Sequence, residues 1–102
     1  MKKVLLLALC FVFAASAATA ATINVWSFTD EVPRMLERYK ELNPDFPHDF
    51  NVTIIATTDG AYQPALDQAL LSGGSEAPDI FTAEAAFVLK YTQGDAANLA
   101  AT

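Results

Sequence analysis

The chain has 102 residues, enough for one domain at most, and 53% of them are hydrophobic. Apart from the amino-terminal segment described next, four basic residues stand against twelve acidic ones, a net charge of −8. Nucleic acids and anionic membrane surfaces are therefore not expected partners, because their negative charge would repel this chain.

Residues 1–20 have the pattern of an export signal. Met1-Lys2-Lys3 gives a basic start, residues 4–15 form an apolar run, and small residues up to Ala20 offer a cleavage site. The apolar run is too short to span a bilayer, which takes about 20 residues. We predict a signal peptide over residues 1–20 and no stable membrane insertion of the mature chain, residues 21–102.

Cys10 is the only cysteine of the chain and lies inside the apolar run. A lipoprotein signal would place its cysteine after a small residue at the end of such a run, so we expect no lipid anchor. The mature chain then has no disulfide, and its stability depends on burial alone. The export signal predicts a periplasmic or otherwise exported location.

The first predicted strand covers residues 23–28 and ends at Thr29-Asp30. Apolar residues then recur at the spacing of one helical face. These residues are Val32, Met35, Leu36, Tyr39 and Leu42. Thr29 or Asp30 is the expected N-cap of this helix, and Asn43-Pro44 ends it.

A polar loop over residues 45–51 follows, and we expect its His48 to have a structural or solvent-exposed role. Residues 52–57 are β-branched almost throughout and predict a second strand, buried on both faces. A second helix begins near Ala61 and ends at Gly73, a glycine C-cap. Residues 80–82 predict a third short strand, and a third helix ends near Gly94.

The predicted order is therefore β-α-β-α-β-α. Right-handed crossovers through helices make such strands parallel and place helices on both faces of the sheet. We predict an α/β fold, a βαβαβα three-layer unit with mainly parallel strands. All strand ends would then meet at one rim, where open α/β sheets bind ligands.

The residues at these strand ends are the candidate binding residues. Aromatic side chains there can stack on sugar faces, while hydroxyls and carboxylates can bond sugar hydroxyls. The candidates are Trp26, Ser27, Phe28, Thr29, Asp30, Asp59, Glu84 and Phe87. The plainer interpretation is that Trp26 is a core residue and that Thr29 or Asp30 only caps a helix.

Catalysis has less support in the sequence than binding. The mature chain has one histidine, no cysteine and no serine in a nucleophile-elbow motif. Asp30, Asp59 and Glu84 could still form the carboxylate pair of a secreted glycoside hydrolase. We predict a binding protein that is not an enzyme and needs no cofactor or metal.

Several segments in order resemble one family. They are the export signal, the strand Ile-Asn-Val-Trp-Ser-Phe, a helix ending Glu-Leu-Asn-Pro, a β-branched strand, a helix ending Ser-Gly-Gly, and Ala-Pro-Asp-Ile-Phe at residues 77–81. Together they resemble the start of the extracellular solute-binding proteins of ABC importers, in the carbohydrate-binding branch that includes the maltose-binding protein.

The resemblance implies a two-lobed protein that closes on a sugar or oligosaccharide and delivers it to an ABC permease. In that family, cleft residues follow the first strand and the Pro-Asp-Ile segment, which here means residues 26–30 and Ala83, Glu84 and Phe87. Family members are several times longer, so this chain would be an amino-terminal fragment, part of the first lobe, and a monomer.

Three alternatives stay open. The ligand could be a non-sugar solute, although no basic cluster at the rim favours an anion, since Arg34 and Arg38 lie on the helix face away from it. The chain could be a fragment of the hydrolase described above. It could also be a free-standing α/β adaptor domain.

Overall fold

The computed structural model describes residues 19–100. The predicted signal peptide, apart from its last two residues, lies outside this part of the chain. The strands and helices are β1 (Thr22–Ser27), α1 (Glu31–Leu42), β2 (Asp49–Ile54), α2 (Tyr62–Ser72), β3 (Ile80–Phe81) and α3 (Val88–Thr92), with 3-10 turns at Thr58–Gly60 and Asp95–Asn98. Within residues 19–100 no helix is long and apolar enough to cross a membrane.

The three strands form one parallel sheet in the order β2-β1-β3. Central strand β1 pairs with β2 from Thr22↔Asp49 to Ser27↔Ile54, and with β3 at Val25↔Ile80 and Trp26↔Phe81. The prediction of an α/β unit with parallel strands joined by helices is confirmed.

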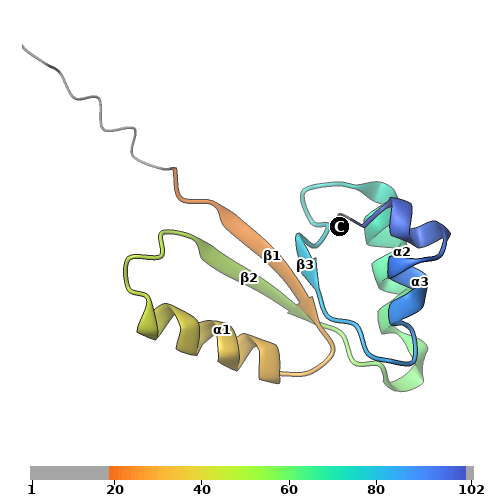
Figure 1. Ribbon diagram of the computed structural model, residues 1–102, viewed down its shortest axis with the longest axis horizontal. Coiled ribbons are helices and arrows are strands. Elements are labelled where there is room, and N and C mark those ends of the chain that lie inside the picture. Colours follow the sequence, from red (N-terminus) through yellow and green to blue (C-terminus); the bar gives the residue numbers. More distant parts are fainter. Residues whose placement is uncertain (1–18, 101–102) are drawn as a thin grey trace, which may run out of the picture.

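Helices lie on both faces of this sheet (Figure 1). Successive side chains of a strand point to opposite faces, and β1 shows this clearly. Trp26 packs against the buried cluster that α2 and α3 provide, with Tyr62, Leu66 and Tyr91 at its centre. Val25, which is 1% exposed, therefore points to the other face, where α1 lies.

The second strand differs from the prediction. It begins at Asp49, three residues early, so part of the expected polar loop is strand, and it ends at Ile54. It is not buried on both faces, since Ile54 is 52% exposed. The physical reason is its place at the edge of the sheet, where one helix layer cannot cover it fully.

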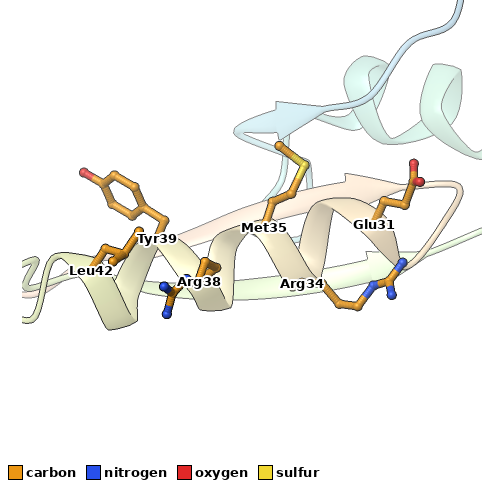
Figure 2. Close-up of a pocket in the computed structure, with 6 residues that line it drawn as sticks. All are labelled: Glu31, Arg34, Met35, Arg38, Tyr39 and Leu42. Atoms are coloured by element: carbon orange, nitrogen blue, oxygen red, sulfur yellow. The ribbon is translucent and has the colours of Figure 1, made fainter.

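The apolar face predicted for α1 is only partly covered by the rest of the protein. None of the residues of α1 is buried. Met35 is 68% exposed and Leu42 64%, and Figure 2 shows them with Tyr39 along one side of the helix. The half-buried residues of α1 are Val32, Pro33, Leu36 and Lys40.

The helix ends follow the expected chemistry in one case and depart from it in the other. Gly73 ends α2 in the left-handed conformation, with φ 58°, as predicted for a glycine C-cap. Asp30 precedes α1, but its side chain makes no capping hydrogen bond. Its carboxylate lies 3.6 Å from the guanidinium of Arg34, one turn along the helix, so Asp30 is not a side-chain cap.

His48 has the structural role expected of it. Its Nδ1 accepts a hydrogen bond from the Ala21 backbone N–H at 3.0 Å, where the chain enters β1. Phe46 lies edge-on to the His48 ring and stacks on Phe50. These contacts fix the loop between α1 and β2 against the start of the sheet.

Candidate ligand-binding rim

The strand order places one switch point in the sheet. The crossover through α1 leads from β1 to β2 on one side, and the crossover through α2 leads back past β1 to β3 on the other. In open α/β sheets, ligands bind outside the carboxyl ends of the strands at such a point. Here that position lies beyond the ends of β1 and β3, which are neighbouring strands.

Residues 27–30, 57–60 and 82–87, which follow the three strands, are called the rim below. Backbone hydrogen bonds hold the strand ends that lead into the rim side by side: Ile55 N–H donates to the Ser27 carbonyl at 2.9 Å, and Thr82 N–H donates to the Trp26 carbonyl at 3.0 Å. Tyr62 adds a side-chain bond, its hydroxyl donating to the Thr82 carbonyl at 2.7 Å. Burial raises the pKa of Tyr62, which keeps this donor protonated.

Ser27 is fully buried and is already hydrogen-bonded. Its hydroxyl donates to the Thr29 carbonyl at 2.8 Å and accepts from the Thr29 N–H at 3.3 Å. This local turn shapes the chain as it leaves β1. The structure thus makes Ser27 a turn-forming residue and not an open ligand donor.

Two predicted stacking residues are packing residues. Phe87 is 7% exposed, and Phe28 packs edge-on against both Tyr62 and Phe87, with ring centroids 5.4 and 6.2 Å away. Their faces are therefore occupied by other rings. Trp26 precedes the first residue of the rim in β1. It is half-buried on the α2 side of the sheet, beside the loop over residues 73–77.

The polar candidates at the rim are exposed. Thr29, Asp30, Asp59 and Glu84 all face solvent, although Asp30 lies beside Arg34. The Glu84 backbone carbonyl accepts from the N–H groups of Phe87 at 3.0 Å and Val88 at 2.9 Å, which fixes the turn that carries its side chain. Asp59 has φ 60°, a left-handed conformation that asparagine and aspartate tolerate better than most residues.

A small hollow of about 130 Å³ lies at the rim between the residues 57–60 turn and the start of α3. It is lined by Thr57, Gly60, Tyr62, Gln63, Glu84, Ala86 and Phe87. Glu84 is the charged group in this lining, and the aromatic rings form its apolar part. The hollow thus brings together residues that follow β2 and residues that follow β3.

Comparisons with protein-family models, with curated proteins and with solved structures found no match to this chain.

The sequence prediction missed Tyr62 and Gln63 as members of this hollow. The sequence did contain a signal for them. Both lie in the first turn of the helix that follows the polar segment Thr58–Gly60, and side chains at such a position can face the rim. Within residues 19–100 no group of three or more histidine, cysteine, aspartate or glutamate side chains could hold a metal ion. The rim as it stands offers carboxylates, hydroxyls and backbone groups beside aromatic rings.

Proposed function

We propose that this chain forms one wall of a sugar-binding cleft, as the amino-terminal part of a solute-binding protein that serves an ABC importer. The observation that carries the proposal is the rim itself: neighbouring parallel strands β1 and β3 end at a topological switch point beside exposed Thr29, Asp30 and Glu84. Exposed hydroxyl and carboxylate groups at such a point can hydrogen-bond an uncharged, hydroxyl-rich ligand.

The second wall of such a cleft would come from another lobe, which closes over the ligand. One wall buries the ligand on one side only, and binding must still offset the lost translational and rotational freedom. We therefore expect the described part alone to bind oligosaccharides in the millimolar range, about −4 kcal/mol. We further propose, on the basis of the predicted export signal, that the protein acts outside the inner membrane with an ABC permease as its partner.

The test is a titration of the chain from Ala21 with oligosaccharides, followed by NMR chemical shifts of the backbone amides. We expect shifts concentrated in residues 27–30, 57–60 and 82–87. Glu84→Gln should weaken binding several-fold, while Glu37→Gln, the same change on the exposed side of α1, should not. Saturating sugar without shifts at the rim would contradict the proposal, and shifts with amino acids or peptides instead would replace the sugar by another solute.

Glycoside hydrolysis is the alternative enzyme activity, with Asp30 and Glu84 as the carboxylate pair. Both side chains are exposed, whereas the general acid of a glycosidase needs a desolvated, apolar setting. This observation favours binding. Turnover of a chromogenic glycoside that is lost in both Asp30→Asn and Glu84→Gln would favour the hydrolase.

A further inference from the structure

Strand β2 lies at one edge of the sheet, and its outer side pairs with no other strand in the described part of the chain. At its two ends, the N–H groups of Asp49 and Ile55 donate to carbonyls of β1 and of the residue before it. Backbone groups of successive strand residues point to alternate sides, and the continuous register with β1 contains no bulge. The backbone N–H and C=O groups of Phe50, Val52 and Ile54 therefore point outward, away from β1.

This edge lacks the features by which proteins usually protect an unpaired strand. Proline, charged side chains, bulges and a very short strand all discourage pairing with another chain. Residues 50–54 contain no proline and no charged residue, and β2 has 6 residues, as many as the central strand β1. Asp49, the charged residue of β2, has its carboxylate 2.6 Å from the Lys40 ammonium. Neither charge nor backbone geometry thus opposes the approach of another strand.

The side chains of the outward-bonding residues add an apolar surface to this edge. Val52 is the register partner of Val25, so Phe50, Val52 and Ile54 lie on the α1 face of the sheet. Phe50 and Val52 are half-buried and line an open hollow of about 500 Å³ between β2 and α1. Ile54 is 52% exposed. A strand that bonds to this edge would therefore also cover apolar side chains.

We propose that the partner of this edge is β2 of a second copy of the chain, paired antiparallel about a twofold axis at Val52. In that register Phe50 lies opposite Ile54 of the second copy, and the two Val52 residues lie opposite each other. These are the residues with outward backbone groups, so each opposed pair can form both N–H···O bonds of a hydrogen-bonded pair. A shift of the register by two residues would leave one of the three beyond the end of the opposite strand. The contact uses the same patch on both copies and is closed.

The cross-strand pairs of this register match in chemistry. On the α1 face Phe50 meets Ile54 and Val52 meets Val52, and such aromatic and β-branched pairs stabilise an antiparallel ladder. On the other face Asn51 meets Thr53, and both are polar. No charged residue falls opposite another charged residue along the paired strands. The acidic surface of the chain is thus kept out of the contact, where it would cause repulsion.

This pairing leaves the rim accessible. Strands β2 and β3 form opposite edges of the sheet, and the switch point lies between β1 and β3. A second copy bonded to the outer side of β2 lies on the side away from β3. The inference does not depend on sugar binding, and it replaces the monomer expected from the family resemblance by a symmetric dimer.

Amide hydrogen exchange of the full chain, with Cys10 kept reduced, tests the pairing at single residues. The N–H groups of Phe50, Val52 and Ile54 should exchange at least about tenfold more slowly in samples that sediment as a dimer than in dilute samples that sediment as a monomer. The Thr53 N–H, which points to β1, should be protected in both. Fast exchange of the outward amides at every concentration would overturn the proposal. Slow exchange in particles of monomer mass would overturn it too, because the same chain would then cover the edge.

Ile54→Lys and Ile80→Lys form a matched pair of variants. Both positions lie on the α1 face of an edge strand, with exposed fractions of 52% and 49%, and both changes alter the net charge equally. Ile54→Lys places a charge opposite Phe50, and twofold symmetry repeats this change, so the dissociation constant of the dimer should rise about tenfold. Ile80→Lys, at the opposite edge, should leave it unchanged.

Sedimentation of both variants over a range of concentrations measures the two dissociation constants, and circular dichroism checks that both variants are folded. Equal dissociation constants would overturn the proposal. The exchange measurement uses the unaltered chain, so it decides the matter even where a variant fails to fold.

Discussion

Tyr62 joins the sheet, the helices and the rim at a single residue. It is 1% exposed, its hydroxyl donates to the Thr82 carbonyl, and its ring contacts Phe28 and Phe87. The hydroxyl therefore fixes the end of β3 while the ring fills the core. A residue that combines both roles is a sensitive point for stability and for the shape of the rim.

Tyr62→Phe keeps the ring but removes the donor to Thr82. Since the Thr82 carbonyl would then lose this partner in a part-buried setting, we expect the free energy of unfolding to fall by about 1 kcal/mol. Urea denaturation measures this change. Tyr39→Phe, at a residue 46% exposed on α1, serves as control and should change little. Equal effects of the two substitutions would contradict the role given to Tyr62.

The carboxylate of Asp67 on α2 accepts hydrogen bonds from Lys90 and Tyr91 on α3 and so links the two helices. Burial by itself would raise the pKa of its carboxyl, but hydrogen bonds from Lys90 and Tyr91 outweigh burial and lower that pKa below its ordinary 3.8. A carboxyl whose pKa is lower in the folded state stabilises the fold above the unfolded pKa. It loses this contribution as pH falls through the folded pKa.

We therefore compare the wild type with Asp67→Asn by denaturation across pH. The wild type should be more stable at neutral pH by less than about 1 kcal/mol, because the pair is partly exposed. This advantage should stay constant down to about pH 4 and shrink below it. An advantage that already disappears between pH 7 and pH 5 would assign it to another group.

At the scale of elements, the two main helices use different means to hold their place. Helix α2 buries Tyr62 and Leu66 and ends at a glycine whose φ is 58°. Helix α1 buries no residue and depends on half-buried Val32 and Leu36 and on the Lys40–Asp49 contact. We expect α1 to open before α2 in hydrogen exchange, since few of its contacts exclude water.

The Gly73–Gly74 pair allows a sharp test of the α2 end. A Cβ would meet nothing within 4 Å at either glycine, but only Gly73 of the two has a positive φ. Gly73→Ala should therefore cost about 1 kcal/mol of stability through backbone strain alone. Gly74→Ala should be close to neutral, and thermal unfolding of both variants decides. A similar loss in the two would mean that strain at the cap is not the cause.

At the scale of the whole molecule, repulsion between acidic residues lowers the stability that the small hydrophobic core provides. Residues 21–102 carry a net charge of −8, while the buried hydrophobic cluster is centred on Tyr62, Leu66, Phe87 and Tyr91. Ion pairs such as Arg38–Glu41 are exposed and contribute little. Self-repulsion of the acidic surface should then be a significant part of the stability balance.

Added sodium chloride should raise the melting temperature of the chain from Ala21. Raising the ionic strength from about 0.01 M to about 0.15 M shortens the Debye length from about 30 Å to about 8 Å, which screens the repulsion between distant carboxylates. Circular dichroism at several salt concentrations measures the effect. A melting temperature that falls with salt would show that the exposed ion pairs dominate instead.

The sequence by itself determined the order of elements, the parallel α/β class and the cap at Gly73. Hydrophobic periodicity, β-branched runs and turn residues are local signals, and they act within a few residues of where they stand. The positions of the rim residues along the chain followed for the same reason, because a strand end is local too.

Only the tertiary structure decided which side chains are exposed and which are buried or hydrogen-bonded within the protein. The sequence could not show that Ser27 closes a turn on Thr29, that Phe28 and Phe87 pack on Tyr62, or that Met35 and Leu42 remain exposed. The packing of Phe28 and Phe87 and the exposure of Met35 and Leu42 depend on segments distant in sequence, which cover one side chain and leave another open. The Ser27–Thr29 turn is local, but the burial of Ser27 also depends on the packed layers. Burial is a property of the packed layers, and a periodic apolar pattern indicates only which side chains are available for it.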